Sequence, residues 1–210
     1  MTSDLTQLLF SIIALLIAIT VHEFSHALVA DKLGDPTPRL MGRLTLNPLA
    51  HLDPIGTIML FLVHFGWGKP VQFDPFNLKN PKKDSALISF AGPTSNLLLA
   101  TLLSLFIRLP VFGFLGVNLM GLLIIIIQIN VLLAIFNLIP IHPLDGFKVV
   151  AGVLPKQYYS SWMELERYGI FFLIILLFPI FGASPIQSIL GPVVSFILNL
   201  LLPGGVGGII

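Results

Sequence analysis

The sequence predicts an all-α polytopic membrane protein, and three observations lead to this prediction. The residue types A, V, I, L, M, F, W, Y and C make up 56% of the 210 residues, and a further 18 residues are glycine, whereas such apolar residues make up about 45–50% of a typical soluble domain. Charged residues contribute 10%, against about 25% in soluble domains. Several apolar stretches approach or exceed the roughly 18 residues that a helix needs to cross a bilayer.

The same composition excludes several other classes of protein. The chain has no cysteine, which excludes a disulfide scaffold, thiolate metal sites and cysteine nucleophiles. Its formal net charge is +1, so the sequence carries no basic footprint for nucleic acid. Residues 1–6 include Asp4 but no Lys or Arg, unlike the positive start of a secretory signal peptide.

Five long apolar segments and one shorter stretch define the expected path through the membrane. The long segments cover about 5–29, 86–109, 115–139, 168–181 and 188–202. The shorter stretch, 55–65, falls below the roughly 17–25 residues of an ordinary span. We therefore expect one membrane domain over residues 1–210, with about five transmembrane helices (six by simple hydropathy) and a membrane re-entrant segment near 54–66. There is no internal repeat and no linker long enough for a second domain.

The distribution of positive charge favours the re-entrant path for residues 55–65. If this stretch enters the membrane and returns, ten of the eleven Lys and Arg residues lie on one side and only Arg108 lies on the other. Positive residues concentrate in cytoplasmic loops, so we expect that side to face the cytoplasm and the N-terminus to lie outside. Because re-entrant backbone must be buried in protein or line a wet cavity, a site is expected nearby.

A metal-binding motif ends the first apolar segment, where residues 22–26 have the pattern H-E-x-x-H. Positions i and i+4 of a helix share a face, so His22 and His26 can offer imidazole nitrogens to one zinc ion. Glu23 lies close enough to act on a metal-bound water as general base and acid. On a soluble helix this motif can be an exposed polar stripe. Here it lies in or beside an apolar run, where ionisable side chains are costly and mark binding sites or pathways.

A catalytic zinc usually has three protein ligands and one open position, so a third ligand is expected. With the re-entrant path, the third long segment runs in the same direction as the first and brings Asp145 to the depth and side of the two histidines. An Asp before a Gly is also an ordinary turn or helix N-cap residue. His142 is the alternative candidate for the third ligand. If it is not a ligand, it either supports one of the ligands or is an ordinary turn residue.

Taken together, these motifs resemble those of the site-2 protease family of intramembrane zinc metalloproteases. The H-E-x-x-H motif is joined by N-x-x-P-x-x-P-L-D-G at residues 137–146, and A-G-P-T-S-N at residues 91–96 is similar to the family's A-G-P-x-x-N segment. Residues 47–56 and 66–70 look like the compact single-domain branch. The likeness covers about residues 5–152, the expected catalytic core, whereas the two C-terminal helices at about 168–202 match only in general character.

The resemblance implies one zinc ion per chain, held by His22, His26 and Asp145, with Glu23 as the general acid and base. It also implies a catalytic centre within the membrane, toward the cytoplasmic side, and a re-entrant element after the first helix. The PDZ or CBS modules that many family members carry do not fit, because no connection in this chain is long enough.

Two asparagines are candidates for binding the oxyanion or the substrate. The Gly92–Pro93 pair should bend its helix and swing Asn96 toward the zinc ion, where its amide can donate to a developing oxyanion. Asn137 is a candidate for orienting Asp145 or binding the substrate backbone. For both, hydrogen bonds between packed helices are the alternative. The remaining histidines, His51 and His64, are expected to be structural or interfacial.

The expected function is that of a zinc-dependent endopeptidase acting on transmembrane proteins in a prokaryotic cell membrane. Its expected partners are a transmembrane protein substrate and the lipid bilayer, and the oligomeric state stays open. Two alternatives remain. A zinc carrier would need ligands repeated along a path to both faces, and the outer half of these helices has almost none. A catalytically inactive relative that holds a partner in the same cleft would not need Glu23.

Overall fold

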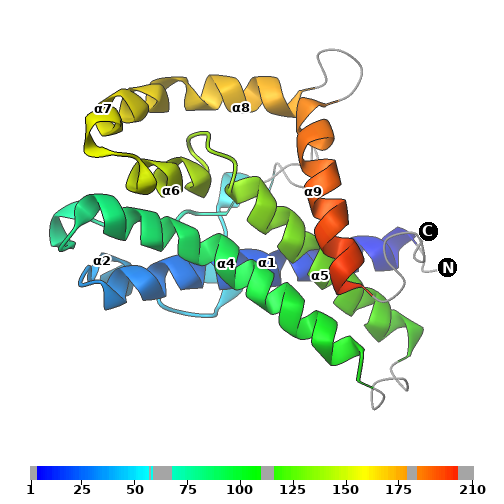
Figure 1. The fold of residues 1–210 in the computed structure, drawn as a ribbon. Coiled ribbons are helices and arrows are strands. Elements are labelled where there is room, and N and C mark those ends of the chain that lie inside the picture. The colour runs from blue at the N-terminus through cyan, green and yellow to red at the C-terminus, as the bar shows by residue number, and fades with distance from the viewer. Residues whose placement is uncertain (1–3, 57, 59–67, 110–115, 179–183, 203–210) are drawn as a thin grey trace.

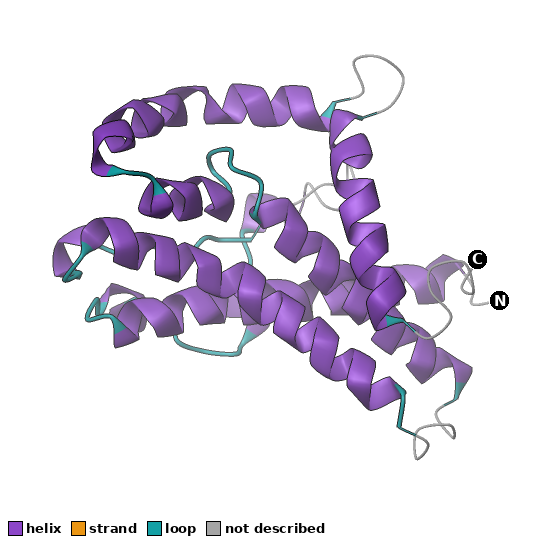
Figure 2. Cartoon of the chain, viewed as in Figure 1, coloured by secondary structure: helices purple, strands orange, loops and turns teal. Residues whose placement is uncertain are grey.

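The computed structural model describes residues 4–56, 58, 68–109, 116–178 and 184–202, and these residues form helices joined by loops (Figures 1 and 2). Within them no strand is formed, and an isolated antiparallel bridge joins Leu52 and Gly68. The all-α fold class is therefore confirmed. The elements in chain order are α1 (Asp4–Lys32), α2 (Thr37–Leu40), η1 (Pro48–Ala50), η2 (Pro75–Asn77), α4 (Pro81–Ile107), α5 (Val117–Asn137), α6 (Asp145–Val153), α7 (Lys156–Glu164), η4 (Leu165–Tyr168), α8 (Gly169–Leu177) and α9 (Pro185–Leu201).

Three of the described helices, α1, α4 and α5, are long and apolar enough to cross a bilayer. They have 29, 27 and 21 residues, which at 1.5 Å per residue gives about 44, 40 and 32 Å, against a hydrocarbon core of roughly 30 Å. Helix α9 has 17 residues and α8 has nine, so the expected number of five spans is not established. Most of the expected re-entrant segment, including His64, lies outside the described residues.

Helices α1, α4 and α5 pack against one another at the centre of the molecule (Figure 1). Helix α4 runs in the opposite direction to α1, and α5 runs in roughly the same direction as α1. The chain between α1 and α4 therefore begins and ends on the same side of the bundle, which agrees with the path expected from the positive charges. At the opposite end of α4, the Arg108 guanidinium donates to the main-chain carbonyls of Leu200 and Leu201, at 2.8 and 2.9 Å.

Small side chains bring the central helices close together. Ala14, Ala18 and Ala30 of α1 are completely buried, as is Ala100 of α4, which packs in an apolar cluster with α5 and α9. Packing of this kind replaces the hydrophobic effect as the force between helices in a bilayer, where small residues let backbones approach. The close approach lets side chains of α1 reach the backbone of α4.

The connection from α1 to α4 is fixed in part by Asp35, which is completely buried. Its carboxylate accepts hydrogen bonds from the main-chain N–H and hydroxyl of Thr37, from the Asn77 amide and from the main-chain N–H of Asp74, at 3.1, 2.6, 2.8 and 2.7 Å. Burial acts to raise the pKa of Asp35, but these hydrogen bonds outweigh it and hold the pKa below its usual value.

A second buried charge, Arg43, fixes the residues that pass beside the site. Arg43 is 3% exposed, and its guanidinium donates to the main-chain carbonyls of Lys69 and Pro70, at 3.2 and 3.4 Å. The main-chain N–H of Lys69 donates to the carbonyl of His51 at 2.8 Å. These bonds hold residues 68–73, which form one wall of the functional site.

Candidate metal centre

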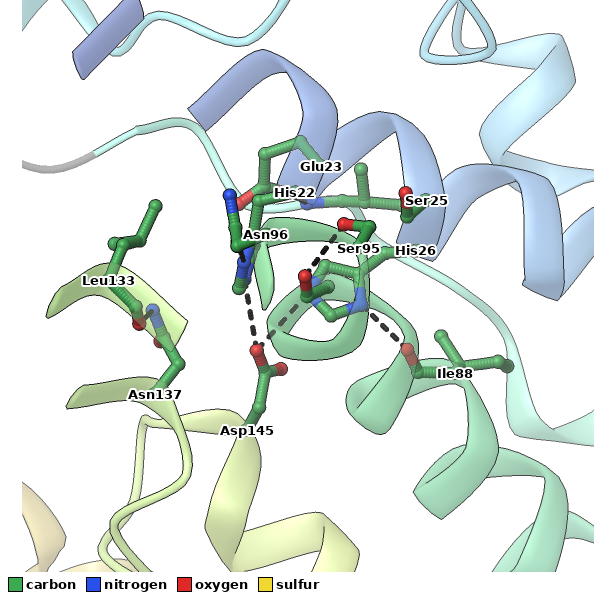
Figure 3. A network of polar contacts seen from close by, with 12 residues as sticks. His22, Glu23, Ser25, His26, Ile88, Ser95, Asn96, Leu133, Asn137 and Asp145 are labelled. Atoms are coloured by element: carbon green, nitrogen blue, oxygen red, sulfur yellow. Dashed lines mark hydrogen bonds and ion pairs between the residues drawn. The ribbon is translucent and has the colours of Figure 1, made fainter. Parts of the chain in front are cut away.

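His22 and His26 lie one helical turn apart on the face of α1 that packs against α4 (Figure 3). The two residues are 5% and 7% exposed. Their rings meet edge to face, with centroids 4.6 Å apart. The helical spacing that the sequence predicts therefore does place both imidazoles in one buried position.

Asp145 reaches this position as the first residue of α6. Its neighbour Gly146 packs so tightly on the main chain that an added Cβ would collide with the carbonyl of Leu138. The Asp145 Oδ2 atom lies 3.0 Å from His22 Nε2 and 3.2 Å from His26 Nε2. The structure thus brings together the three side chains that were expected as ligands, and in the described part of the chain no other group of His, Asp or Glu is arranged to hold a metal.

The donor atoms of this triad fit a zinc ion. The Nδ1–H groups of His22 and His26 point away from Asp145, toward the Asn96 side-chain oxygen at 2.7 Å and the Ile88 carbonyl at 2.6 Å. Each Nε2 lone pair is then directed at the carboxylate, so three electron-pair donors converge on one point and a cation satisfies all of them. The observed separations of 3.0 and 3.2 Å are close to the roughly 3.3 Å between ligands of a tetrahedral zinc site.

Gly92 of α4 is the residue that lets the two imidazoles approach this helix. A Cβ atom at this position would lie within 3.0 Å of ring atoms of both His22 and His26. The carbonyl of Ile88, one turn earlier on α4, holds His26 through its Nδ1–H. The wall behind the ligands therefore has room for a glycine and for no larger residue.

Asn96 lies behind His22, completely buried, and does not line the cavity described below. Its amide nitrogen donates to the Ala18 carbonyl at 2.9 Å and to the Asn130 side-chain oxygen at 2.7 Å. Both N–H groups are thus used, and this geometry leaves none for an oxyanion, the role expected from the sequence. Asn96 instead orients the His22 ring, and the interhelical hydrogen bond weighed as the alternative is present.

Glu23 borders a cavity of about 390 Å³ that the metal triad also lines. Its Oε2 atom accepts a hydrogen bond of 2.8 Å from the main-chain N–H of Val71. Because Arg43 fixes the main chain just before Val71, this bond holds the carboxylate at the cavity wall. The arrangement gives a carboxylate next to a metal triad, as expected from the H-E-x-x-H motif.

The two other candidate residues of the sequence occupy different places. Asn137 lines the cavity, and its amide donates to the Leu133 carbonyl of its own helix at 3.0 Å, so substrate binding by Asn137 stays a prediction. His142 does not join the triad. Its Nδ1 atom lies 3.6 Å from a carboxylate oxygen of Glu166, and its ring packs on Phe147.

Several features of the site were not predicted from the sequence. They are the exclusion of side chains at Gly92, the role of Asn130 behind Asn96, the hydrogen bond from Val71, and the position of Lys148 on the cavity wall. The A-G-P-T-S-N segment was a usable signal for Gly92, but it suggested only a bend. A main-chain N–H carries no signature in sequence, so Val71 could not have been found.

Comparison with known families identifies the family to which the chain is similar. The model of peptidase family M50 matches residues 10–116, about half of the chain. The matched range includes His22, Glu23, His26 and Asn96, whereas Asp145 lies beyond it.

Several curated relatives are similar to this chain, and their names include the words zinc metalloprotease. YwhC of Bacillus subtilis is 38% identical over 178 residues, which cover 81% of each chain. Rip2 of Mycobacterium tuberculosis is 32% identical over 172 residues, covering 77% of this chain and 63% of Rip2. MJ0392 of Methanocaldococcus jannaschii is 28% identical over 148 residues, covering 70% of this chain and 34% of MJ0392. No solved structure matches the chain significantly.

The family match and the similarity to YwhC agree with the geometry of the triad. They also agree with the resemblance carried by the sequence motifs. The chain belongs to peptidase family M50, the family of the site-2 proteases.

Proposed function

We propose that this family M50 member is a zinc-dependent intramembrane endopeptidase, which hydrolyses peptide bonds within or next to transmembrane segments of other membrane proteins. The observation that carries the proposal is the depth of His22, Glu23 and His26 within the apolar helix α1, where Asp145 meets the two histidines. His22 and His26 precede Lys32, the end of α1, by ten and six residues, or about 15 and 9 Å along the helix. The relatives named as zinc metalloproteases support the metal and the class of reaction.

The chemistry divides between the metal and the residues of the chain. Zinc, when held by His22, His26 and Asp145, supplies a Lewis acid that activates water and polarises a carbonyl. Glu23 takes the proton from the attacking water and returns it to the leaving amine. The hydrogen bond from Val71 keeps the Glu23 carboxylate beside the triad during both transfers.

The cavity favours a short extended stretch of apolar peptide as the substrate. Leu15, Ile19, Leu133 and Phe136 line it together with the triad. A helical substrate would present carbonyls that are already hydrogen-bonded within the helix, so the peptide must unwind locally before its carbonyl can reach the site. The volume of about 390 Å³ suits a few residues of extended chain.

We further propose a location in a prokaryotic cell membrane, with the N-terminus outside and the site toward the cytoplasm. The support for this orientation is the expected gathering of ten of eleven positive residues at the Lys32 end of the bundle, as is usual for the cytoplasmic side. Relatives from Bacillus subtilis and Mycobacterium tuberculosis support the prokaryotic membrane.

The test is cleavage of a single-span model peptide by the full-length protein in liposomes. We expect Glu23→Gln to lower the rate by at least about 100-fold, because a general base contributes about 10²–10⁴-fold, while the zinc content stays unchanged. Removal of zinc by a chelator should abolish cleavage, and zinc should restore it. Full cleavage by Glu23→Gln would contradict the proposed mechanism.

The same liposomes separate the alternatives. Bound zinc together with retention of peptides that are never cut would identify an inactive binding relative. Accumulation of zinc inside the liposomes without any proteolysis would identify a zinc carrier. Either result would replace the endopeptidase proposal.

A further inference from the structure

The cavity at the metal centre has two chemically different ends. Leu15 and Ile19 precede His22 on α1, so they line the end that lies deeper in the membrane. Phe73 lines the other end and packs against Ala30 and its neighbours at the Lys32 end of α1. A peptide that lies along the cavity therefore passes from an apolar environment, across the metal triad, toward the polar end of the bundle.

Lys148 lies at the polar end of this cavity. It is exposed, it follows Asp145 by one turn of α6, and it lines the cavity wall. Its ammonium lies over the Phe73 ring, 4.6 Å from the centroid, a contact that favours a cation without neutralising it. The ion pairs found among the described residues involve other cations and not Lys148. The carboxylates of Asp145 and Glu166 attract this ammonium electrostatically, but neither forms an ion pair with it, and Asp145 is the expected metal ligand. The polar end thus presents a positive charge that is free to pair with a carboxylate of a bound peptide.

The geometry points to Lys148 as a specificity-determining residue that binds a carboxylate of the substrate just beyond its apolar stretch, on the polar side of the scissile bond. This inference rests on the proposed function, since it concerns the peptide that the cavity holds. It gives a basis for choosing among substrates by the charge that flanks their apolar stretch, which the metal triad and Glu23 do not provide.

Selection by this charge runs against the usual composition of membrane proteins. Cytoplasmic flanks of transmembrane segments carry an excess of Lys and Arg, which the Lys148 ammonium would repel. Discrimination by a repelling charge is a common way to reject a frequent competitor. A site of this kind would leave most transmembrane segments uncut and select the minority whose flank is acidic.

The test is a set of acetylated and amidated single-span peptides that differ at one flanking position, where they carry Glu, Gln or Lys. The position is moved along both flanks, and kcat/KM is measured with the full-length protein in liposomes of neutral lipid. At the responsive position we expect the Glu peptide to be cleaved about fivefold faster than the Lys peptide, as an exposed charge pair allows, with the Gln peptide between them. A second pair of Gln peptides, one with a free C-terminus and one amidated, shows whether a terminal carboxylate serves as well as a side chain.

Variants of the protein separate recognition from a structural role of Lys148. Lys148→Glu should reverse the order of the three peptides, and Lys148→Gln should bring their rates within about twofold of one another. Lys83→Glu, a charge reversal on an exposed residue that does not line the cavity, should keep the wild-type order. If Lys148 only braced α6 against Phe73, its variants would lower all three rates alike.

Two outcomes would overturn the inference in distinguishable ways. Equal rates for the three peptides in the wild type, or an unchanged order in Lys148→Glu, would show that Lys148 does not read the charge of the flank. Absence of cleavage of all three by zinc-loaded wild type would instead contradict the proposed function, and the inference with it.

Discussion

The two walls of the metal centre are built differently. On the wall of α1 and α4, both ligand imidazoles are buried and each Nδ1–H has a fixed acceptor, and Gly92 leaves no free space behind them. On the wall of α6 and residues 68–73, the Asp145 side chain is 17% exposed, and the main-chain N–H of Val71 makes one hydrogen bond to Glu23, which reaches this wall from α1. Lys148 on that wall is exposed.

The difference separates the tasks of the two walls. Loss of a partner that orients a metal ligand typically lowers metal affinity by about 10–100-fold, and such partners are found on the buried wall. The groups that would meet water and peptide lie on the other wall, which borders the cavity. Changes to the buried wall should therefore act on metal binding. Changes to the open wall should act on turnover, except at Asp145, which is itself an expected metal ligand.

The largest effect is expected for Gly92→Ala, which adds a Cβ within 3.0 Å of both imidazoles. Overfilling forces neighbouring groups to move, and here it displaces both imidazoles. We therefore expect zinc affinity to fall by at least about 100-fold, the upper end of the range for loss of one supporting partner. The measurement is zinc binding by competition with a chromogenic chelator. Gly191→Ala in α9, where the added atom meets open space, should bind zinc like the wild type. Wild-type affinity in Gly92→Ala would show that the wall is not rigid.

A smaller effect on the same wall is expected for Asn96→Ala, which removes the acceptor of the His22 Nδ1–H. Loss of such a partner lowers metal affinity by about 10–100-fold. Asn130→Ala should have a smaller effect. Asn130 contacts Asn96 and not His22, and without it the Asn96 amide still donates to the Ala18 carbonyl. The same chelator competition ranks the two variants, and the reverse ranking would contradict the proposed role of Asn96.

On the open wall, Val71→Pro removes the main-chain N–H that holds Glu23. We expect kcat to fall by about tenfold, less than for complete loss of a general base, with zinc affinity unchanged. Val71→Ala keeps the N–H and serves as the matched control. A fall in zinc affinity that accompanied the loss of activity would show that the two walls are not separate.

The smallest effect on the site is expected for Asp35→Asn, in the connection that supports residues 68–73. The folded state holds the pKa of Asp35 below its usual value, so its carboxylate stabilises the fold at pH above about 4, and this contribution is lost as the pH falls through the folded-state pKa. We expect the variant to be about 1–3 kcal/mol less stable at pH 7, with the difference shrinking in acid. Thermal unfolding in detergent at several pH values measures this, with Asp4→Asn, at the exposed start of α1, as the control. A difference independent of pH would contradict the assignment.

The sequence predicted the three expected metal ligands better than the residues that surround them. His22 and His26 have a helical spacing inside an apolar run, and a helix of that composition in a bilayer has few alternatives. Asp145 could be placed because the expected path through the membrane makes the third long segment run in the same direction as the first. The end of the third segment, where Asp145 follows, then lies on the same side as the two histidines. Asn96 was expected to face the zinc ion, but whether an amide points toward a site or behind a ligand depends on its neighbours, here Ala18 and Asn130.

The C-terminal part was predicted less well. Residues 168–181 are apolar enough to suggest a span, but the described chain forms η4 and then α8, which ends at Leu177. The preceding residues are tied to α6 by Trp162, whose indole N–H donates to the Phe147 carbonyl at 2.9 Å and whose ring stacks on Phe147. Hydropathy describes the composition of a segment, and it does not contain such tertiary contacts.

The most direct test of the central claim is the zinc content of the purified full-length protein and four variants. We expect about one zinc per chain in the wild type and in Glu23→Gln, and less than about a tenth of that in His22→Ala, His26→Ala and Asp145→Ala, because three protein ligands are the usual minimum for a catalytic zinc. Full zinc content in Asp145→Ala would contradict the triad and return the third ligand to His142 or another residue. Absence of zinc from the wild type after loading would contradict the metal centre itself.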